Sequence, residues 1–244
     1  MKAFLCLGTP DEVIGILPIV QHEFETTEKK PMLVLSRVLM GWELSPFSMI
    51  SYSFEDFTGA LAIAKRTFES VVAFPSRNNV TVEHRHPSHQ FDQWDRAGVL
   101  HLWRKLPLTL PRPANAEELV KQHIGEEPTI LLADDDVERP FAFRDELHQA
   151  LMEEFPLHQI VRLANLQLPH LLDYLALYDA ADLIVCAETL HLQLSRATKT
   201  PVLAIANDQP SPWHGSAPHP RFAWYGHYGT LAGNKLCLPT LTAS

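Results

Sequence analysis

Two pairs of neighbouring polar residues, Asp11-Glu12 and Glu188-Thr189, each follow shortly after an apolar run, and their side chains are of types that take part in catalysis or ligand binding. A carboxylate in such a place can take a proton from a hydroxyl as a general base. A hydroxyl beside main-chain N–H groups can hold an anion or a sugar. The same residue types also stabilise the first turn of a helix, and for Glu188-Thr189 alone a helix cap is the simpler interpretation.

The elements that would position these pairs follow from an alternation of short apolar runs with longer amphipathic ones. Strands are predicted at 2–7, 31–36, 48–53, 70–75, 129–133, 158–163, 182–187 and 201–206. Helices are predicted at 12–26, 58–68, 89–105, 143–155, 168–181 and 189–198. Strands that are apolar throughout and separated by helices indicate parallel sheets covered on both faces. Ligands bind such sheets at the carboxyl ends of the strands, where both polar pairs are expected.

Three prolines within PLTLPRPAN, residues 107–115, favour an extended connector between two α/β halves. The predicted fold class is therefore α/β, with two Rossmann-like domains whose parallel sheets face each other across a cleft. The first domain is predicted at 1–106, the linker at 107–115 and the second domain at 116–244. The stretch 207–229 is interpreted as a loop rich in Pro, Gly, His and aromatic residues.

Composition limits the classes of partner. The chain has 244 residues, 46% of them hydrophobic, which is enough for a substantial core. A formal net charge of −9 argues against a nucleic-acid partner. No apolar run is long enough to span a membrane and the N-terminal one is too short for a signal peptide, so we expect a cytoplasmic protein with no transmembrane segment. Peripheral membrane contact stays open. Cys6, Cys186 and Cys237 are interpreted as reduced structural thiols.

Two segments resemble the ADP-heptose:lipopolysaccharide heptosyltransferases of bacteria, glycosyltransferase family 9. Residues 181–206, ADLIVCAETLHLQLSRATKTPVLAIA, are similar to the donor-binding segment of that family: a strand, Asp-Thr-Gly-x-x-His, a small-residue helix and a Pro-initiated strand. Residues 8–20, GTPDEVIGILPIV, resemble its Gly-Asp-x-x-x-x-x-Pro opening. The resemblance implies a GT-B fold and inverting transfer of a sugar, such as a heptose, from a nucleotide-sugar to a glycan acceptor hydroxyl, as in lipopolysaccharide biosynthesis. It implies no cofactor besides the nucleotide-sugar co-substrate, and no catalytic metal.

The resemblance also implies roles for residues of the first domain, which would bind the acceptor. Glu12 stands at the family's catalytic aspartate and would be the base. Asp11 stands at the family's glycine and would lie beside the acceptor. Arg77 and Arg85, in a loop after the fourth strand, are further candidates for acceptor contact.

The second domain would bind the nucleotide-sugar, although its motif departs from the family pattern. Leu190 replaces the glycine, adding bulk where the main chain should approach a diphosphate, and Gln193 replaces the histidine. The neighbouring His191 is a candidate compensating donor. The family has a basic residue after the first strand of its second domain, and Arg139, with Arg144 as the second choice, is the candidate for that cation here. The acidic run at 134–136 in the same loop would repel a diphosphate. The full set of implied donor-binding residues is Glu188, Thr189, Leu190, His191, Gln193, Arg139 and Trp213.

Two other clusters have simpler interpretations. His84-x-His86-x-x-His89 has zinc-ligand residue types but no completing cysteine or histidine pair, so a polar loop is favoured over a metal site. Its position after the fourth strand makes acceptor contact, together with Arg77 and Arg85, the second choice. The run at 134–136 is interpreted as an acidic, solvated loop. The altered donor motif also leaves an alternative function open: a catalytically degenerate GT-B scaffold that binds a glycan or a protein without turnover.

Overall fold

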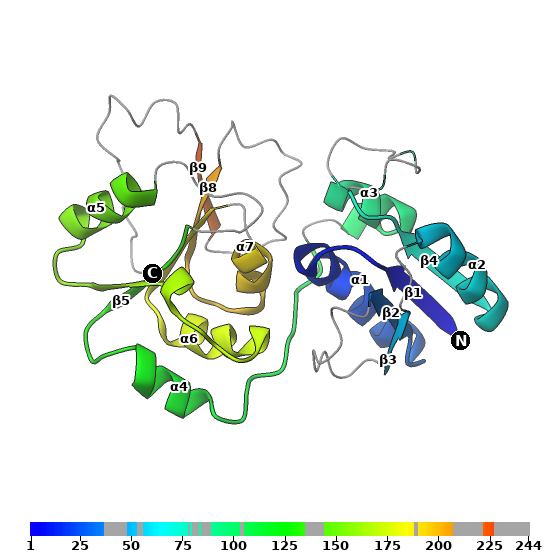
Figure 1. Ribbon diagram of the computed structural model, residues 1–244, viewed down its shortest axis with the longest axis horizontal. Coiled ribbons are helices and arrows are strands. Elements are labelled where there is room, and N and C mark those ends of the chain that lie inside the picture. Colours follow the sequence, from blue (N-terminus) through cyan, green and yellow to red (C-terminus); the bar gives the residue numbers. More distant parts are fainter. Residues whose placement is uncertain are drawn as a thin grey trace. The chain divides into compact units, whose positions relative to one another are not determined.

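The computed structural model describes residues 1–36, 48–52, 56–77, 79, 83, 89–102, 105–134, 144–187, 190–206 and 222–226, of which 48–52, 206 and 222–226 are described by their main chain alone. The chain divides into two compact units, Met1–Pro111 with Pro212–Pro218 and Arg112–Ser211 with His219–Ser244. Each unit contains its own parallel sheet with helices packed against it (Figure 1).

The sheet of the first unit has the order β3-β2-β1-β4, and every pair of neighbours is parallel. Its strands are β1 (Lys2–Cys6), β2 (Met32–Ser36), β3 (Ser48–Tyr52) and β4 (Ser70–Phe74). Its helices are α1 (Pro10–Thr27), α2 (Phe57–Thr67) and α3 (His89–Arg96), followed by a 3₁₀ turn at Leu100–Leu102. The connections from β1 to β2 and from β3 to β4 run through α1 and α2, as parallel strands require.

Small side chains let α2 pack closely on one face of this sheet. Ala60 and Ala64 of α2 lie in one buried cluster with Ala3 and Leu5 of β1, and Phe68, directly after the helix, belongs to the same cluster. Successive strand side chains alternate in direction, so Phe4 points to the opposite face, where α1 and α3 lie (Figure 1). The sheet is thus covered on both sides, which leaves the ends of its strands as the places for polar chemistry.

The sheet of the second unit has the order β6-β5-β7-β8-β9 and is also parallel throughout. Its strands are β5 (Thr129–Ala133), β6 (Gln159–Arg162), β7 (Leu183–Ala187), β8 (Val202–Ala206) and β9 (Phe222–Gly226). Its helices are α4 (Ala116–His123), α5 (Arg144–Glu154), α6 (Tyr174–Ala180) and α7 (Leu190–Leu194). Three 3₁₀ turns, at Leu163–Asn165, Leu171–Asp173 and Ser195–Ala197, complete the described elements.

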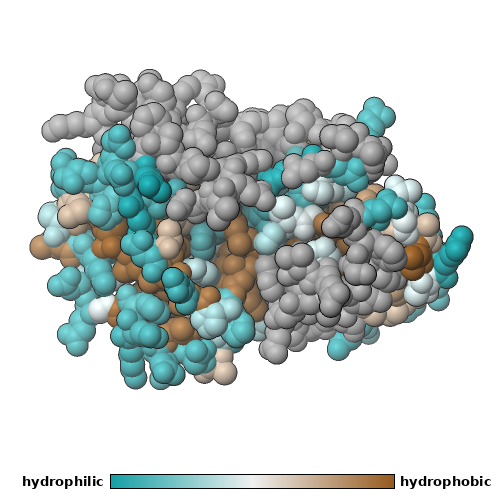
Figure 2. All heavy atoms as spheres, in the orientation of Figure 1, coloured by the Kyte–Doolittle hydropathy of each residue, from teal (hydrophilic) through white to brown (hydrophobic). Residues whose placement is uncertain are grey.

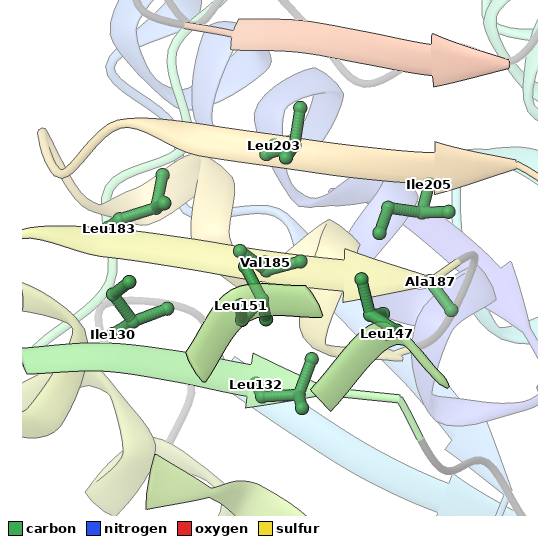
Figure 3. Close-up of a cluster of buried hydrophobic side chains, with 9 residues drawn as sticks. All are labelled: Ile130, Leu132, Leu147, Leu151, Leu183, Val185, Ala187, Leu203 and Ile205. Atoms are coloured by element: carbon green, nitrogen blue, oxygen red, sulfur yellow. The ribbon is translucent and has the colours of Figure 1, made fainter. Parts of the chain in front are cut away.

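One face of this second sheet is buried under α5 (Figure 3). Leu147 and Leu151 project from α5 onto aliphatic side chains of the three central strands. These strand residues are all nearly or fully buried: Ile130, Leu132, Leu183, Val185, Ala187, Leu203 and Ile205. At about 25 cal/mol per Å² of apolar surface removed from water, such a cluster is a main source of the stability of the unit.

The strands predicted from the sequence are confirmed, and the differences concern helices and one strand. The helix predicted at 89–105 ends at Arg96, because Gly98 adopts a positive φ of 72°. The helices predicted at 168–181 and 189–198 are each partly 3₁₀: α6 follows the turn at Leu171–Asp173, and α7 leads into the turn at Ser195–Ala197. The helix α4 and the strand β9 were not predicted, β9 lying in the stretch interpreted as a loop.

Polar side chains dominate the described surface in the view of Figure 2. The large hydrophobic side chains exposed among the residues in the ranges given above are Met1, Met152 and Leu157. Within those ranges no helix combines the length and the apolar character needed to cross a membrane. The thiols of Cys6 and Cys186 are buried and unpaired with each other, and burial raises the pKa of Cys6 to about 12. Cys237 lies outside the described residues.

Candidate functional site

The carboxyl end of the first sheet has a topological switch point between β1 and β4. The chain leaves β1 toward β2 on one side, whereas β4 is added on the other side, so the loops after β1 and β4 diverge. The loop after β1 leads to Asp11 and Glu12, and the loop after β4 carries Ser76 and Arg77. Open parallel sheets place their ligand sites at such a crevice.

The Glu12 carboxylate joins these two loops. Its Oε2 accepts a hydrogen bond from the Thr9 N–H at 3.0 Å, as in a capping box. Its Oε1 accepts one from the Arg77 N–H at 2.9 Å and one from the Ser76 hydroxyl at 3.3 Å. The His89 Nε2 lies 3.4 Å from the same Oε1. The side chain is only 1% exposed, so Glu12 is held in place as part of the folded core of the site.

Burial raises the pKa of Glu12 above its ordinary value of 4.5. Hydrogen bonds from the main chain of Arg77 and Thr9, and the charge of the Arg77 guanidinium, oppose this shift. A carboxylate with a raised pKa binds a proton more strongly, which favours its use as a general base.

Asp11 is the more accessible carboxylate of the pair, at 23% exposure. Its Oδ2 lies 3.1 Å from Nη2 of Arg77, and the Thr9 hydroxyl donates to its Oδ1. The guanidinium of Arg77 thus faces both carboxylates, since its Nε also lies 3.5 Å from the Glu12 Oε1. The structure therefore brings together three of the residues named from the sequence, Asp11, Glu12 and Arg77.

Besides Thr9 and Ser76, sequence reasoning missed Gly8, Gln93 and His89 as neighbours of Glu12. A Cβ on Gly8 would lie 1.7 Å from the Glu12 Oε2, so the carboxylate occupies the space that a side chain at position 8 would need. Gln93, fully buried in α3, donates from Nε2 to the main-chain oxygen of Glu12 at 3.3 Å. His89 was named only within the cluster His84-x-His86-x-x-His89, as part of a polar loop or of an acceptor contact, and not as a neighbour of Glu12. Of these residues, Gly8 could have been noticed in the sequence, because a glycine four residues before an acid leaves room for the acidic side chain to turn back over it.

The second sheet has its own switch point between β5 and β7. Asp134, directly after β5, is 1% exposed, and its Oδ2 lies 3.0 Å from Nε of Arg162 in β6. The interpretation of the run at 134–136 as a solvated acidic loop is therefore wrong for Asp134, because the neighbouring strand supplies a cation that compensates its burial. Asp135 and Asp136 lie outside the described residues.

Leu190, His191 and Gln193 all belong to α7, a helix of only five residues that starts after β7. Gln193 is 7% exposed, and its Oε1 accepts a hydrogen bond from Nη1 of Arg196 at 3.2 Å. Burial of the Arg196 guanidinium lowers its pKa to about 10. Nδ1 of His191 lies 2.5 Å from the hydroxyl of Tyr178, which belongs to α6. Enclosure lowers the pKa of the imidazole to about 4, so His191 is neutral at physiological pH.

The remaining residues named from the sequence, Arg85, Arg139, Glu188, Thr189 and Trp213, lie outside the described residues, as do His84 and His86. In the part of the chain that the structure describes, no three or more His, Cys, Asp or Glu side chains are grouped as metal ligands would be.

The chain is an α/β protein of two units, each built on a parallel sheet, with a buried carboxylate at the switch point of the first. Comparison with solved structures narrows this class further. The chain matches the glycosyltransferase of family 9 from Veillonella parvula with a TM-score of 0.65 and 10% identity, over 95% of this chain and 87% of that one. It matches Escherichia coli ADP-heptose lipopolysaccharide heptosyltransferase II with a TM-score of 0.61 and 11% identity, over 92% and 89%.

A third match is the iron-containing dodecameric heptosyltransferase TibC of enterotoxigenic E. coli, in complex with ADP-D-β-D-heptose, with a TM-score of 0.59 and 14% identity over 93% of this chain and 62% of that one. No protein-family model matches the sequence, and no curated protein matches it. The chain thus has the heptosyltransferase-like fold of glycosyltransferase family 9, as the two sequence segments led us to expect.

Proposed function

We propose that this protein is an inverting glycosyltransferase that moves a sugar from a nucleotide-sugar to a hydroxyl of a glycan. The observation that carries the proposal is the Glu12 carboxylate, buried at the β1–β4 switch point of a family 9 fold, with a raised pKa and a guanidinium beside it. ADP-heptose is the donor to test first, because TibC has been solved with ADP-D-β-D-heptose. No cofactor besides the donor is proposed.

The proposed reaction is a single displacement. The acceptor oxygen forms a bond to the anomeric carbon while the bond from that carbon to the diphosphate oxygen breaks, which inverts the anomeric centre. The acceptor proton passes to Glu12, and the nucleoside diphosphate leaves with the electron pair. The Ser76 hydroxyl, 3.3 Å from the Glu12 Oε1, marks the place where an acceptor hydroxyl would donate to the same oxygen.

Arg77 has two roles in this proposal. Its main-chain N–H and its guanidinium both favour the charged form of Glu12, which is the form that can accept a proton. Its guanidinium also holds Asp11, which remains accessible enough to bind a second hydroxyl of the acceptor. The donor would be bound by the second unit, through α7 and the neighbouring Glu188 and Thr189.

The proposal is tested by measuring nucleoside diphosphate release from a panel of ADP- and UDP-sugars with glycan acceptors, alongside calorimetric binding of each donor. We expect Glu12→Gln to lower turnover about a hundred- to ten-thousand-fold while donor binding is retained. Glu23→Gln is the matched control, since Glu23 pairs with Lys2 at 2.7 Å, outside the site. Failure of every nucleotide-sugar to bind the wild-type protein would overturn the proposal.

One observation keeps the non-catalytic alternative in view. Both oxygens of Glu12 already accept main-chain hydrogen bonds, and the side chain is almost fully enclosed. A degenerate scaffold would keep such a carboxylate for stability alone. In that case Glu12→Gln would lower the free energy of unfolding, glycan binding would persist, and no donor would be turned over by the wild-type protein.

A further inference from the structure

A short hydrogen bond joins α6 and α7, which are neighbours in the second unit (Figure 1). The Tyr178 hydroxyl lies 2.5 Å from Nδ1 of His191, and the ring of Tyr174 meets the imidazole edge-on, with centroids 4.7 Å apart at 78°. Tyr178 is fully buried, and its main-chain oxygen accepts a hydrogen bond from the Thr200 hydroxyl at 2.5 Å. The phenol is therefore a fixed partner for a side chain that is itself only partly buried.

The direction of this hydrogen bond follows from the two protonation states. Burial, and to a smaller extent the nearby Cys186 and Tyr174, raise the pKa of Tyr178 well above 10, so the phenol keeps its proton. The imidazole is neutral and carries one N–H. Among the residues that the structure describes, His191 is the one acceptor for the Tyr178 hydroxyl, so the phenol donates to Nδ1. The proton of the imidazole then resides on Nε2.

We infer that Tyr178 is a positioning residue that fixes His191 as the Nε2–H tautomer, so that His191 offers an uncharged N–H to the diphosphate of the nucleotide-sugar. The inference rests on the proposed function for its ligand. His191 comes four residues after the end of β7, beside the β5–β7 switch point. Because Tyr178 engages Nδ1, Nε2 is the ring nitrogen from which His191 would donate to a ligand. The residue would thereby compensate for Gln193, which stands at the histidine of the family pattern.

Because His191 stays neutral, its contribution to donor binding should depend on pH differently from that of an ordinary histidine. A histidine with an ordinary pKa of about 6.5 binds a diphosphate more weakly as pH rises and its charge is lost. His191 is neutral throughout that range, so its contribution to donor affinity should be constant between pH 5.5 and 8. Tyr174 and Tyr178 are the titratable groups of α6 that face the ring; burial and, less strongly, Asp173 raise the pKa of Tyr174, so neither phenol ionises there.

The test combines two measurements on the full chain. The ¹⁵N chemical shifts of His191 report the tautomer without ligand, and we expect Nε2–H in the wild type and a mixture of tautomers in Tyr178→Phe. Calorimetry with ADP from pH 5.5 to 8 should show about a three- to tenfold loss of affinity in His191→Leu, and recovery in His191→Gln, whose amide can donate from a similar position. Tyr178→Phe should weaken ADP binding across this pH range, because part of its neutral imidazole is then the Nδ1–H tautomer, which has no proton to donate from Nε2.

Tyr174→Phe is the matched control, since the Tyr174 hydroxyl donates to the main-chain oxygen of Leu166 and leaves Nδ1 of His191 unaffected. A wild-type Nδ1–H tautomer, or one unchanged by Tyr178→Phe, would overturn the positioning role. Equal affinity of His191→Leu and wild type for ADP would overturn the ligand role. If wild type binds no nucleotide at all, the proposed function fails along with the ligand, whereas the tautomer is still decided by the chemical shifts.

Discussion

At the scale of single residues, the carboxylate of Glu12 is the feature on which the first unit's chemistry depends. Ser76 lies 64 residues and Arg77 65 residues further along the chain, yet both donate hydrogen bonds to the Glu12 carboxylate, because β4 pairs with β1. The position of Glu12 after the first strand was predictable from the sequence. Its partners were not, because they depend on which strand of the sheet lies beside β1.

Gly8→Ala tests whether the folded-back carboxylate requires a glycine. The φ of Gly8 is not positive, so alanine fits the backbone and the cost comes from the clash with Glu12 Oε2. We expect a loss of about 1–3 kcal/mol in the free energy of unfolding, measured with denaturant. In a Glu12→Ala background the clashing Oε2 is absent and only the Cβ of residue 12, at 3.1 Å, remains close, so the same substitution should cost clearly less. Equal costs in the two backgrounds would show that Glu12 does not occupy this space.

The raised pKa of Glu12 makes stability depend on pH in a defined direction. The folded protein binds a proton at Glu12 more tightly than the unfolded chain does, so this group's contribution to the free energy of unfolding falls as pH rises from about 4.5 through the folded pKa. Glu12→Gln lacks that term. The wild-type value minus the variant value, from denaturant titrations between pH 4 and 8, should therefore decrease with pH. An increase would mean that Arg77 and the hydrogen bonds outweigh burial.

At the scale of elements, the strands were predicted well from the sequence, whereas the short helix α4, the strand β9 and the end of α3 were not. Apolar runs of five residues marked the strands, because both faces of each sheet are covered. The helix α4 was missed because Leu119 is its one buried residue, which gives no apolar stripe. The strand β9 was missed because its sequence FAWYG stands among prolines, glycines and histidines that favour loops. Gly98 ended α3 early by a positive φ that no periodicity reveals.

The Gln21 side chain of α1 attaches the extended segment around Thr109 by two main-chain hydrogen bonds, as a neighbouring strand would. Gln21, 9% exposed, accepts from the Thr109 N–H at 3.1 Å and donates to the Thr109 oxygen, between the buried Leu108 and Leu110. Gln21→Met should lower the free energy of unfolding by about 1–3 kcal/mol and speed hydrogen exchange at the Thr109 amide. Gln122→Met, at an exposed site on α4, is the control. Similar effects of both changes would contradict this role.

At the scale of the whole molecule, each unit has its own sheet and buried core, and the proposed chemistry assigns the donor to the second unit and the base to the first. Binding to one unit stabilises the unit that binds. ADP at about one hundred times its dissociation constant should add about 2.7 kcal/mol to the protection of core amides in the second unit, such as Ile184 and Val185. Amides of β1, such as Phe4, should change little if the two units open separately. Hydrogen exchange of the full chain with and without ADP measures both sets at once.

Protection confined to the first unit would place the nucleotide there and contradict the assignment, whereas equal protection of both sheets would show that they unfold as one cooperative body.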